Sequence, residues 1–153
     1  AYNATQSTFV YRSGYSAGTF WNSSNITMLN DSIYNDFWMK NDNGQTCWTL
    51  PGPYYSNLTG GPIWNFSNPN AREYYLNNVV NGYYVKNNMG YVNSIFFDMC
   101  DWVFCDFSWI KNTNCSNFTG LSDDEKRQFG NDYIDTMIKA TEMLNSINII
   151  PIF

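Results

Sequence analysis

The sequence contains no histidine, and this absence excludes several kinds of active site. Ser-His-Asp and Cys-His catalysis need an imidazole as general base, and zinc sites built on imidazole need it as a ligand. Any chemistry must therefore come from carboxylates, amides, hydroxyls, thiols, Lys or Arg.

The chain also has few basic residues and no long apolar run. It has 8 Lys and Arg against 13 Asp and Glu, a net charge of −5. This balance argues against nucleic acid as a partner and leaves no basic stripe for anionic lipid. No apolar run approaches the roughly 20 residues needed to span a bilayer. No signal peptide is visible and the first residue is Ala1, so we expect a processed chain or a piece of a longer one.

What the sequence has in abundance is apolar and aromatic side chains. Hydrophobic residues make up 44% and aromatic residues 19% of the 153 positions. This is enough to bury a sizeable core, so we expect one globular domain over residues 1–153.

Sequons of the form Asn-x-Ser/Thr are the strongest indication of the compartment. There are eight, more than twice the number expected by chance from 23 Asn and 24 Ser and Thr. They begin at Asn3, Asn22, Asn25, Asn30, Asn57, Asn65, Asn114 and Asn117. Together with an even number of cysteines they indicate a secreted or cell-surface glycoprotein carrying covalent N-glycans.

The four cysteines suit two disulfides. Cys105 and Cys115 fall within one predicted loop and make a plausible local pair, which leaves Cys47 with Cys100. Four cysteines permit three pairings, so this is a preference. A metal site is the weaker interpretation, because the spacing is not a paired Cys-x-x-Cys, and we expect no metal or cofactor.

Short apolar runs alternate with helical patterns along the chain. Asn68-Pro69 and Ser122–Glu125 are helix starts, the first with Ala71, Tyr75 and Val79 on one face and the second running to about residue 146. The inner face of the second helix is expected to carry Phe129, Tyr133, Met137 or Ile138, Thr141 and Leu144. Asn43-Gly44 predicts a two-residue hairpin turn. Strands are expected at 9–12, 63–66, 95–97 and 148–153.

Asp98 ends the most apolar of these strands, and the other elements are organised around it. Ile95 and Phe97 share one side of that strand, while Phe96 and Asp98 share the other. Parallel sheets place their ligand sites at the carboxyl ends of their strands, so Asp98 is a candidate site residue. The alternative is an ordinary capping or turn aspartate.

This order of elements predicts an α/β fold, a parallel sheet with outer helices and an inserted β-hairpin, either doubly wound or a barrel. A complete eightfold barrel needs about 250 residues. The last strand is apolar and has no helix after it, an exposed edge that is a liability. We therefore expect a part of a larger chain, or a partner subunit that covers this edge.

Three stretches carry a resemblance to a known family: 64–75 (WNFSNPNAREYY), 94–102 (SIFFDMCDW) and 149–153 (IIPIF). With the capped helix between the last two, they resemble the central units of glycoside-hydrolase-like barrels, in particular the endo-α-1,4-polygalactosaminidase-like group. The resemblance implies a partial (β/α)8 TIM-like barrel. It also implies that the aspartate closing the strand, Asp98, lies in the active site.

Glycoside hydrolysis usually needs two carboxyl groups, about 5–5.5 Å apart for retention and 6.5–9.5 Å for inversion. Asp98 and Asp101 could form such a pair, although a turn can also place them on opposite sides. Trp48, Trp64 and Trp102 are candidates for stacking on sugar rings, and for each the alternative is packing in the core or a loop.

Arg12 and Asn65 lie at strand ends and could hydrogen-bond a substrate. Arg12 could equally form a structural ion pair. If Asn65 points into the barrel, we expect its sequon to remain unmodified.

Two functions follow. The first is a secreted, N-glycosylated, glycoside-hydrolase-like protein that acts on or binds carbohydrate through strand-end carboxylates. The second is a non-catalytic structural glycoprotein, a self-associating subunit of an extracellular coat or filament. Sequon density and the open last strand favour the second, and fold alone does not decide between them.

Overall fold

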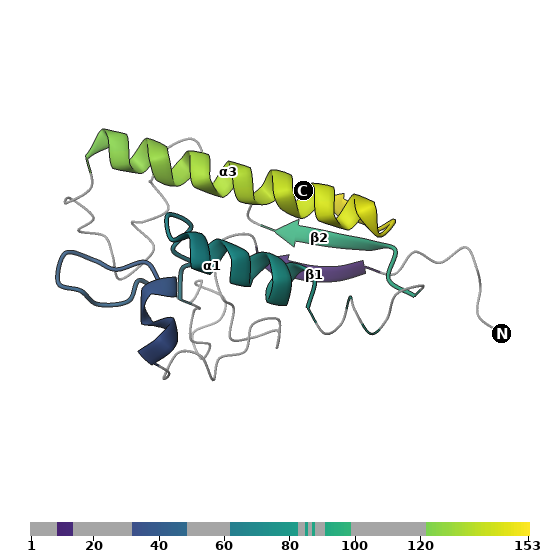
Figure 1. The fold of residues 1–153 in the computed structure, drawn as a ribbon, viewed down its shortest axis with the longest axis horizontal. Coiled ribbons are helices and arrows are strands. Elements are labelled where there is room, and N and C mark those ends of the chain that lie inside the picture. The colour runs from purple at the N-terminus through teal and green to yellow at the C-terminus, as the bar shows by residue number, and fades with distance from the viewer. Residues whose placement is uncertain are drawn as a thin grey trace, which may run out of the picture.

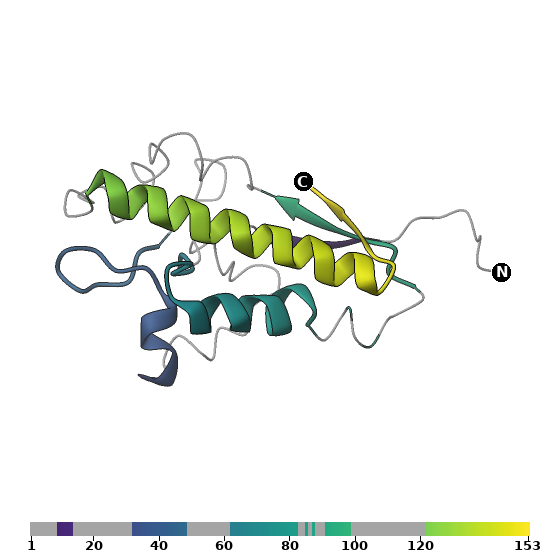
Figure 2. The same ribbon diagram turned by 45° about the horizontal axis from the view of Figure 1, so that its top comes forward.

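A computed structural model describes residues 9–13, 32–48, 62–82, 91–98 and 122–153, together with Val85 and Asn87. At 9, 11–13 and 98 only the backbone is described. Figure 1 shows helices α1 (Pro69–Tyr74) and α3 (Asp123–Ser146) running side by side along the strands, and Figure 2 shows α3 in front of the strands with α1 below it.

The sheet consists of three parallel strands in the order β1, β2, β3. They are β1 (Phe9–Ser13), β2 (Ser94–Asp98) and β3 (Ile150–Ile152). In the register of the sheet, Ile95 lies between Val10 and Pro151. One face of β2 is buried, since Ile95 and Phe97 are at most 1% exposed. The predicted strands at 9–12, 95–97 and 148–153 are confirmed.

The predicted (β/α)8 barrel is wrong. The described residues hold one open sheet of three strands, far fewer than the eight that a barrel closes. The segment 63–66, expected as a further strand, does not join this sheet. It forms antiparallel bridges instead, between Trp64 and Trp38 and between Pro62 and Trp48. An apolar pattern indicates a buried extended segment, but it does not determine which segment pairs with it. Here the pairing is with residues 38 and 48, outside the parallel sheet.

Three short extended segments meet at a ring of backbone hydrogen bonds. Met39 N–H donates to the carbonyl of Ile63 at 2.9 Å, Ile63 N–H to Cys47 at 2.9 Å, and Cys47 N–H to Met39 at 2.8 Å. All three residues are buried. Because each has its donor and acceptor satisfied, the segments can enter the core without forming a regular sheet.

The predicted hairpin turn lies where it was expected but is one residue longer. Asn41 N–H donates to the carbonyl of Gln45, and Gly44 N–H donates to Asn41, which leaves three residues in the loop. Within this loop only Gly44 has a positive φ, of 73°. This is a type I turn followed by a left-handed glycine, and not the two-residue turn that Asn43-Gly44 suggested.

Helix α1 (Pro69–Tyr74) continues as the π-helix η3 (Tyr75–Val80). The Asn68 side chain caps it by accepting from Asn70 N–H at 2.9 Å. As predicted, Ala71, Tyr75 and Val79 form its buried face. Before it, the 3-10 helix η2 (Ser32–Phe37) packs on α1 through the rings of Tyr34 and Phe37.

Helix α3 (Asp123–Ser146) begins at the predicted capping box, in which Ser122 and Glu125 bond each other's backbone N–H. Its inner face carries Phe129, Tyr133 and Leu144 as expected. Met137 is the buried residue of the predicted pair, since Ile138 is 51% exposed. Thr141 is half-buried at the border of this face and bonds the Met137 carbonyl.

Strand β3 is an edge strand with exposed apolar side chains. Ile150 is 63% exposed, Ile152 42% and Phe153 59%. Ile150 N–H donates to the carbonyl of Asn93, so the backbone of the next residue, Pro151, faces the open side. Proline has no N–H to donate there, which is a common way of blunting an edge.

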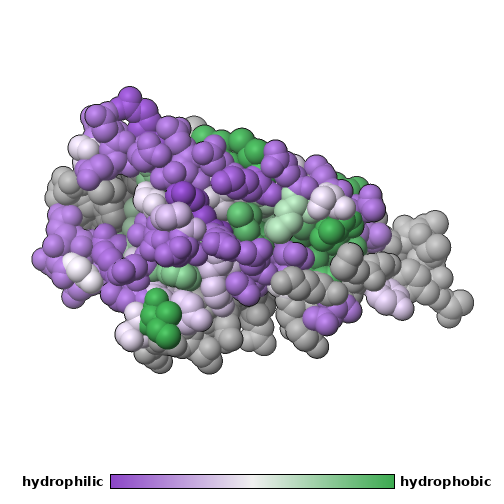
Figure 3. All heavy atoms as spheres, viewed as in Figure 1, coloured by the Kyte–Doolittle hydropathy of each residue, from purple (hydrophilic) through white to green (hydrophobic). Residues whose placement is uncertain are grey.

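Polar residues cover most of the face seen in Figure 3, and apolar residues reach this surface in separate patches. Among the described residues, no helix combines the length and the apolar character needed to cross a membrane.

Gly82, two residues after the end of η3, and Gly130 in α3 give opposite predictions for the same substitution. A Cβ at Gly82 would lie 2.2 Å from the Asn78 carbonyl oxygen, whereas a Cβ at Gly130, within α3, would meet nothing within 4 Å. We expect Gly130→Ala to raise the free energy of unfolding by about 0.5–1 kcal/mol, because alanine loses less entropy in a helix. We expect Gly82→Ala to lower it by about 1–3 kcal/mol. Urea denaturation measures both, and a stabilised Gly82→Ala would contradict the packing described.

Candidate functional site

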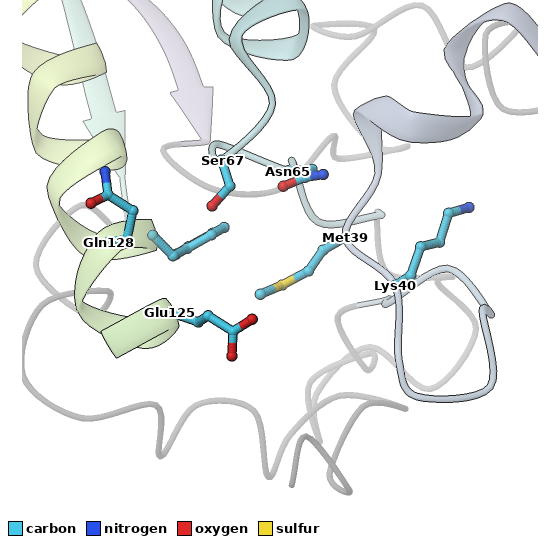
Figure 4. A pocket seen from close by; sticks show the side chains of 7 residues that line it. Met39, Lys40, Asn65, Ser67, Glu125 and Gln128 are labelled. Atoms are coloured by element: carbon cyan, nitrogen blue, oxygen red, sulfur yellow. The ribbon is translucent and has the colours of Figure 1, made fainter. Parts of the chain in front are cut away.

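A groove of about 440 Å³ opens beside the first turns of α3. In the described part of the chain, three pieces form it: α3, the segment before α1, and the residues before the hairpin. Its lining residues are Met39, Lys40, Asn65, Ser67, Glu125, Gln128 and Phe129. The size falls in the range of small-molecule sites. The first turns of α3 lie at the end of the molecule toward which β1 and β2 point, so the groove is on the carboxyl side of the parallel strands (Figures 1 and 4).

The floor of the groove is apolar. Met39 is 5% and Phe129 3% exposed, and Figure 4 shows the Met39 side chain reaching into the space between the polar groups. Both side chains belong to the hydrophobic core, so the floor is fixed by the packing of the domain.

The Asn65 amide is held in one orientation. Its Nδ2 donates to the backbone carbonyl of Asp36 at 3.2 Å, and the Asn68 amide donates to the same oxygen at 3.0 Å. The Oδ1 atom therefore faces the groove, as Figure 4 shows, and it has no partner among the described residues.

Gln128 stands at the edge of the groove and is held by α3. Its Nε2 donates to Asp132 Oδ1 at 3.2 Å. Asp132 also pairs with Arg72 at 3.2 Å, and Arg72 donates to the Phe66 carbonyl at 2.6 Å. This series of polar contacts connects α3 to α1 and to Phe66, which lies between the groove residues Asn65 and Ser67.

Glu125 is the carboxylate of the groove. Its Oε2 accepts from the backbone N–H and the hydroxyl of Ser122, both at 2.8 Å. These bonds, the backbone one first, lower the pKa of Glu125 below its ordinary value of 4.5. The side chain is therefore ionised at neutral pH and accepts hydrogen bonds. It is not tuned as a general acid, which requires a raised pKa.

Lys40 lines the groove but turns its ammonium away from it. The Nζ atom donates to Asn35 Oδ1 and to Thr46 Oγ1, each at 2.8 Å. In Figure 4 the Lys40 side chain points away from Glu125 and Ser67. The Ser67 hydroxyl, by contrast, is directed into the groove and is exposed.

Asp98 and Arg12 lie near the carboxyl end of the sheet. Asp98 is the last residue of β2, opposite Ser13, and Arg12 lies opposite Phe97. Only the backbone is described at both positions, so their catalytic and binding roles stay predictions. Asp101 and Trp102 lie outside the described residues.

The structure places the remaining predicted binding residues differently. Trp64 is 1% exposed and its ring lies 4.7 Å from that of Trp38, so it packs in the core and offers no face to a sugar. Trp48 is half-buried and bridges to Pro62. Of the predicted set, Asn65 is the residue that the structure brings to the groove.

Cys47 is fully buried and disulfide-bonded, which agrees with the expected use of cysteine. Cys100, Cys105 and Cys115 lie outside the described residues, so the pairing stays a prediction. The asparagines of the other seven sequons also lie outside the described residues, so their glycosylation stays a prediction as well. The described residues contain no group of three or more acidic or Cys side chains that could hold a metal ion.

Sequence reasoning missed most of the groove. Glu125 was recognised only as part of a capping box, and Gln128 and Ser67 carried no signal of their own. Their meeting depends on how the 65–67 segment packs on α3, which no local pattern reveals.

Comparison with known proteins gives no matching family model, no similar curated protein and no similar solved structure. The resemblance of residues 64–75 and 94–102 to the glycosidase-like group therefore stays a prediction.

The position of Asn65 predicts that its sequon is not modified. Its amide nitrogen points at the Asp36 carbonyl, so a glycan attached to that nitrogen would push Asp36, and with it η2, away from Asn65. Glycopeptide mapping of the protein produced through the secretory pathway of a host cell should find Asn65 unmodified, and Asn65→Gln should leave the total glycan mass unchanged. A glycan found on Asn65 would contradict the packing of this wall.

Proposed function

We propose that the protein is a secreted or cell-surface glycoprotein that binds carbohydrate in the groove beside α3. The observation that carries this proposal is the combination of Asn65, Ser67 and Glu125 around an apolar floor of Met39 and Phe129. Amide, hydroxyl and carboxylate groups hydrogen-bond sugar hydroxyls, and an apolar floor accepts the C–H face of a sugar ring.

The expected compartment is supported by two independent features. The disulfide at Cys47 suits an oxidising environment, where such bonds persist. The eight sequons suit the same environment.

Binding is better supported than hydrolysis. Hydrolysis needs an acid with a raised pKa and a second carboxyl group, whereas the pKa of Glu125 is lowered. Catalysis by Asp98 and Asp101 rests on the sequence, and an unchanged glycosidase activity in Asp98→Asn would exclude it.

Filling the groove should abolish sugar binding. In Ser67→Phe an exposed side chain that faces the groove is replaced by a ring that occupies it. We expect at least about a tenfold loss of affinity for the neutral oligosaccharides that the unmodified protein binds on a glycan array, measured by calorimetry. Asn70→Phe is the matched control, because Asn70 is exposed on α1 and outside the groove. The proposal would be overturned if Ser67→Phe bound the sugar as tightly as the protein without the substitution, or if that protein bound no glycan.

A second function, a structural subunit of an extracellular coat or filament, is favoured by the exposed apolar side chains of β3. Pro151 removes the outward backbone donor, so association there would pack side chains rather than extend the sheet. Sedimentation velocity over a range of concentrations tests this function. Large assemblies that Ile152→Lys dissolves would support it, and a monomer at all concentrations would contradict it.

A further inference from the structure

We propose that the groove recognises its ligand through hydrogen bonds that the ligand donates, and that it therefore selects neutral, hydroxyl-rich sugars over acidic ones. This inference rests on the proposed carbohydrate function. It adds the direction of the hydrogen bonds and the charge of the ligand.

Each amide nitrogen at the groove is directed at the protein and gives it one of its two N–H groups. Asn65 gives its Nδ2 to the Asp36 carbonyl, and Gln128 gives its Nε2 to the Asp132 carboxylate. A flipped amide would set two oxygens against each other at these positions, so the orientation is fixed. Asn65 therefore presents its oxygen, an acceptor, to the groove, whereas the Gln128 amide lies at the outer edge (Figure 4).

Glu125 adds a second acceptor, which carries a full charge. Both of its hydrogen bonds from Ser122 go to Oε2. The other oxygen, Oε1, has no partner within the described part of the chain. A ligand hydroxyl that donates to it makes a charge-assisted bond, which is stronger than a neutral one.

Among the described lining residues, no cation balances this charge inside the groove. Lys40 is the one basic residue among the lining residues described, and two hydrogen bonds at 2.8 Å hold its ammonium against Asn35 and Thr46. A ligand carboxylate would face the Glu125 carboxylate and the Asn65 amide oxygen, and no ammonium or guanidinium of the described lining residues is directed toward it.

The direction of the bonds can be tested with deoxy and deoxyfluoro sugars. Fluorine cannot donate a hydrogen bond, whereas it keeps weak acceptor character and the size of a hydroxyl. The parent is the methyl glucoside, galactoside or mannoside that binds most tightly, measured by ligand-observed NMR. At each sugar position whose hydroxyl donates to the groove, we expect the deoxy and the deoxyfluoro analogue to bind roughly tenfold more weakly than the parent. The two analogues should lose the same amount of affinity.

The charge preference is tested with the parent's uronate, in which the hydroxymethyl group is oxidised to a carboxylate. We expect the uronate to bind roughly tenfold more weakly than the parent. Glu125→Gln should remove most of this difference while keeping the bond from Ser122 N–H. Glu142→Gln is the matched control, since Glu142 is an exposed residue roughly 25 Å further along the same helix.

The outcomes separate the two proposals. If none of the three parents binds, the carbohydrate function is overturned and this inference with it. If a parent binds but its fluoro analogues keep the affinity, or the uronate binds as well, the function stands and the acceptor groove is wrong. If Glu142→Gln changes the preference as much as Glu125→Gln, the charge of the groove is not its cause.

Discussion

The burial of the Phe66 ring is the constraint on which the groove depends. This ring is fully buried and packs edge-on against Tyr75 of η3 and Tyr133 of α3, with centroid distances of 5.3 and 5.0 Å. It also contacts Phe129, at 6.2 Å. Large aromatic side chains dominate core energetics, and edge-on pairs add to the burial. Because Phe66 is fixed between two helices, its chain neighbours Asn65 and Ser67 are fixed beside the first turns of α3.

The backbone at Phe66 is held as firmly as its ring. Arg72 donates to the Phe66 carbonyl and pairs with Asp132, which in turn holds Gln128. The pair is partly buried, with side-chain exposures of 24% and 15%, so solvent screens it less than a surface pair. One network therefore sets the distance between α1 and α3 and orients a polar side chain of the groove. A rigid wall of this kind reduces the entropy cost of binding a small ligand.

Elements whose cause is local could be predicted from the sequence. Asn68-Pro69 and the Ser122–Glu125 box contain the atoms that cap their own helices, and both helices begin there. The apolar run before Asp98 was sufficient to predict a buried strand. The barrel failed because the number of strands and the partner of each are long-range properties. Trp64 shows this most clearly, since its pairing with Trp38 turned an expected strand-end binding residue into a core residue. The groove could not be predicted from the sequence for the same reason, because its walls are far apart in sequence and are brought together by the packing of Phe66.

The most direct test of this account is to map the binding surface by NMR. Uniformly ¹⁵N-labelled protein is titrated with the neutral sugar that binds most tightly. The largest shifts are expected at the backbone amides of Ser67, Glu125 and Gln128 and at the side-chain amide of Asn65, with little change along β3. Saturable shifts confined to another surface would contradict the groove as the binding site.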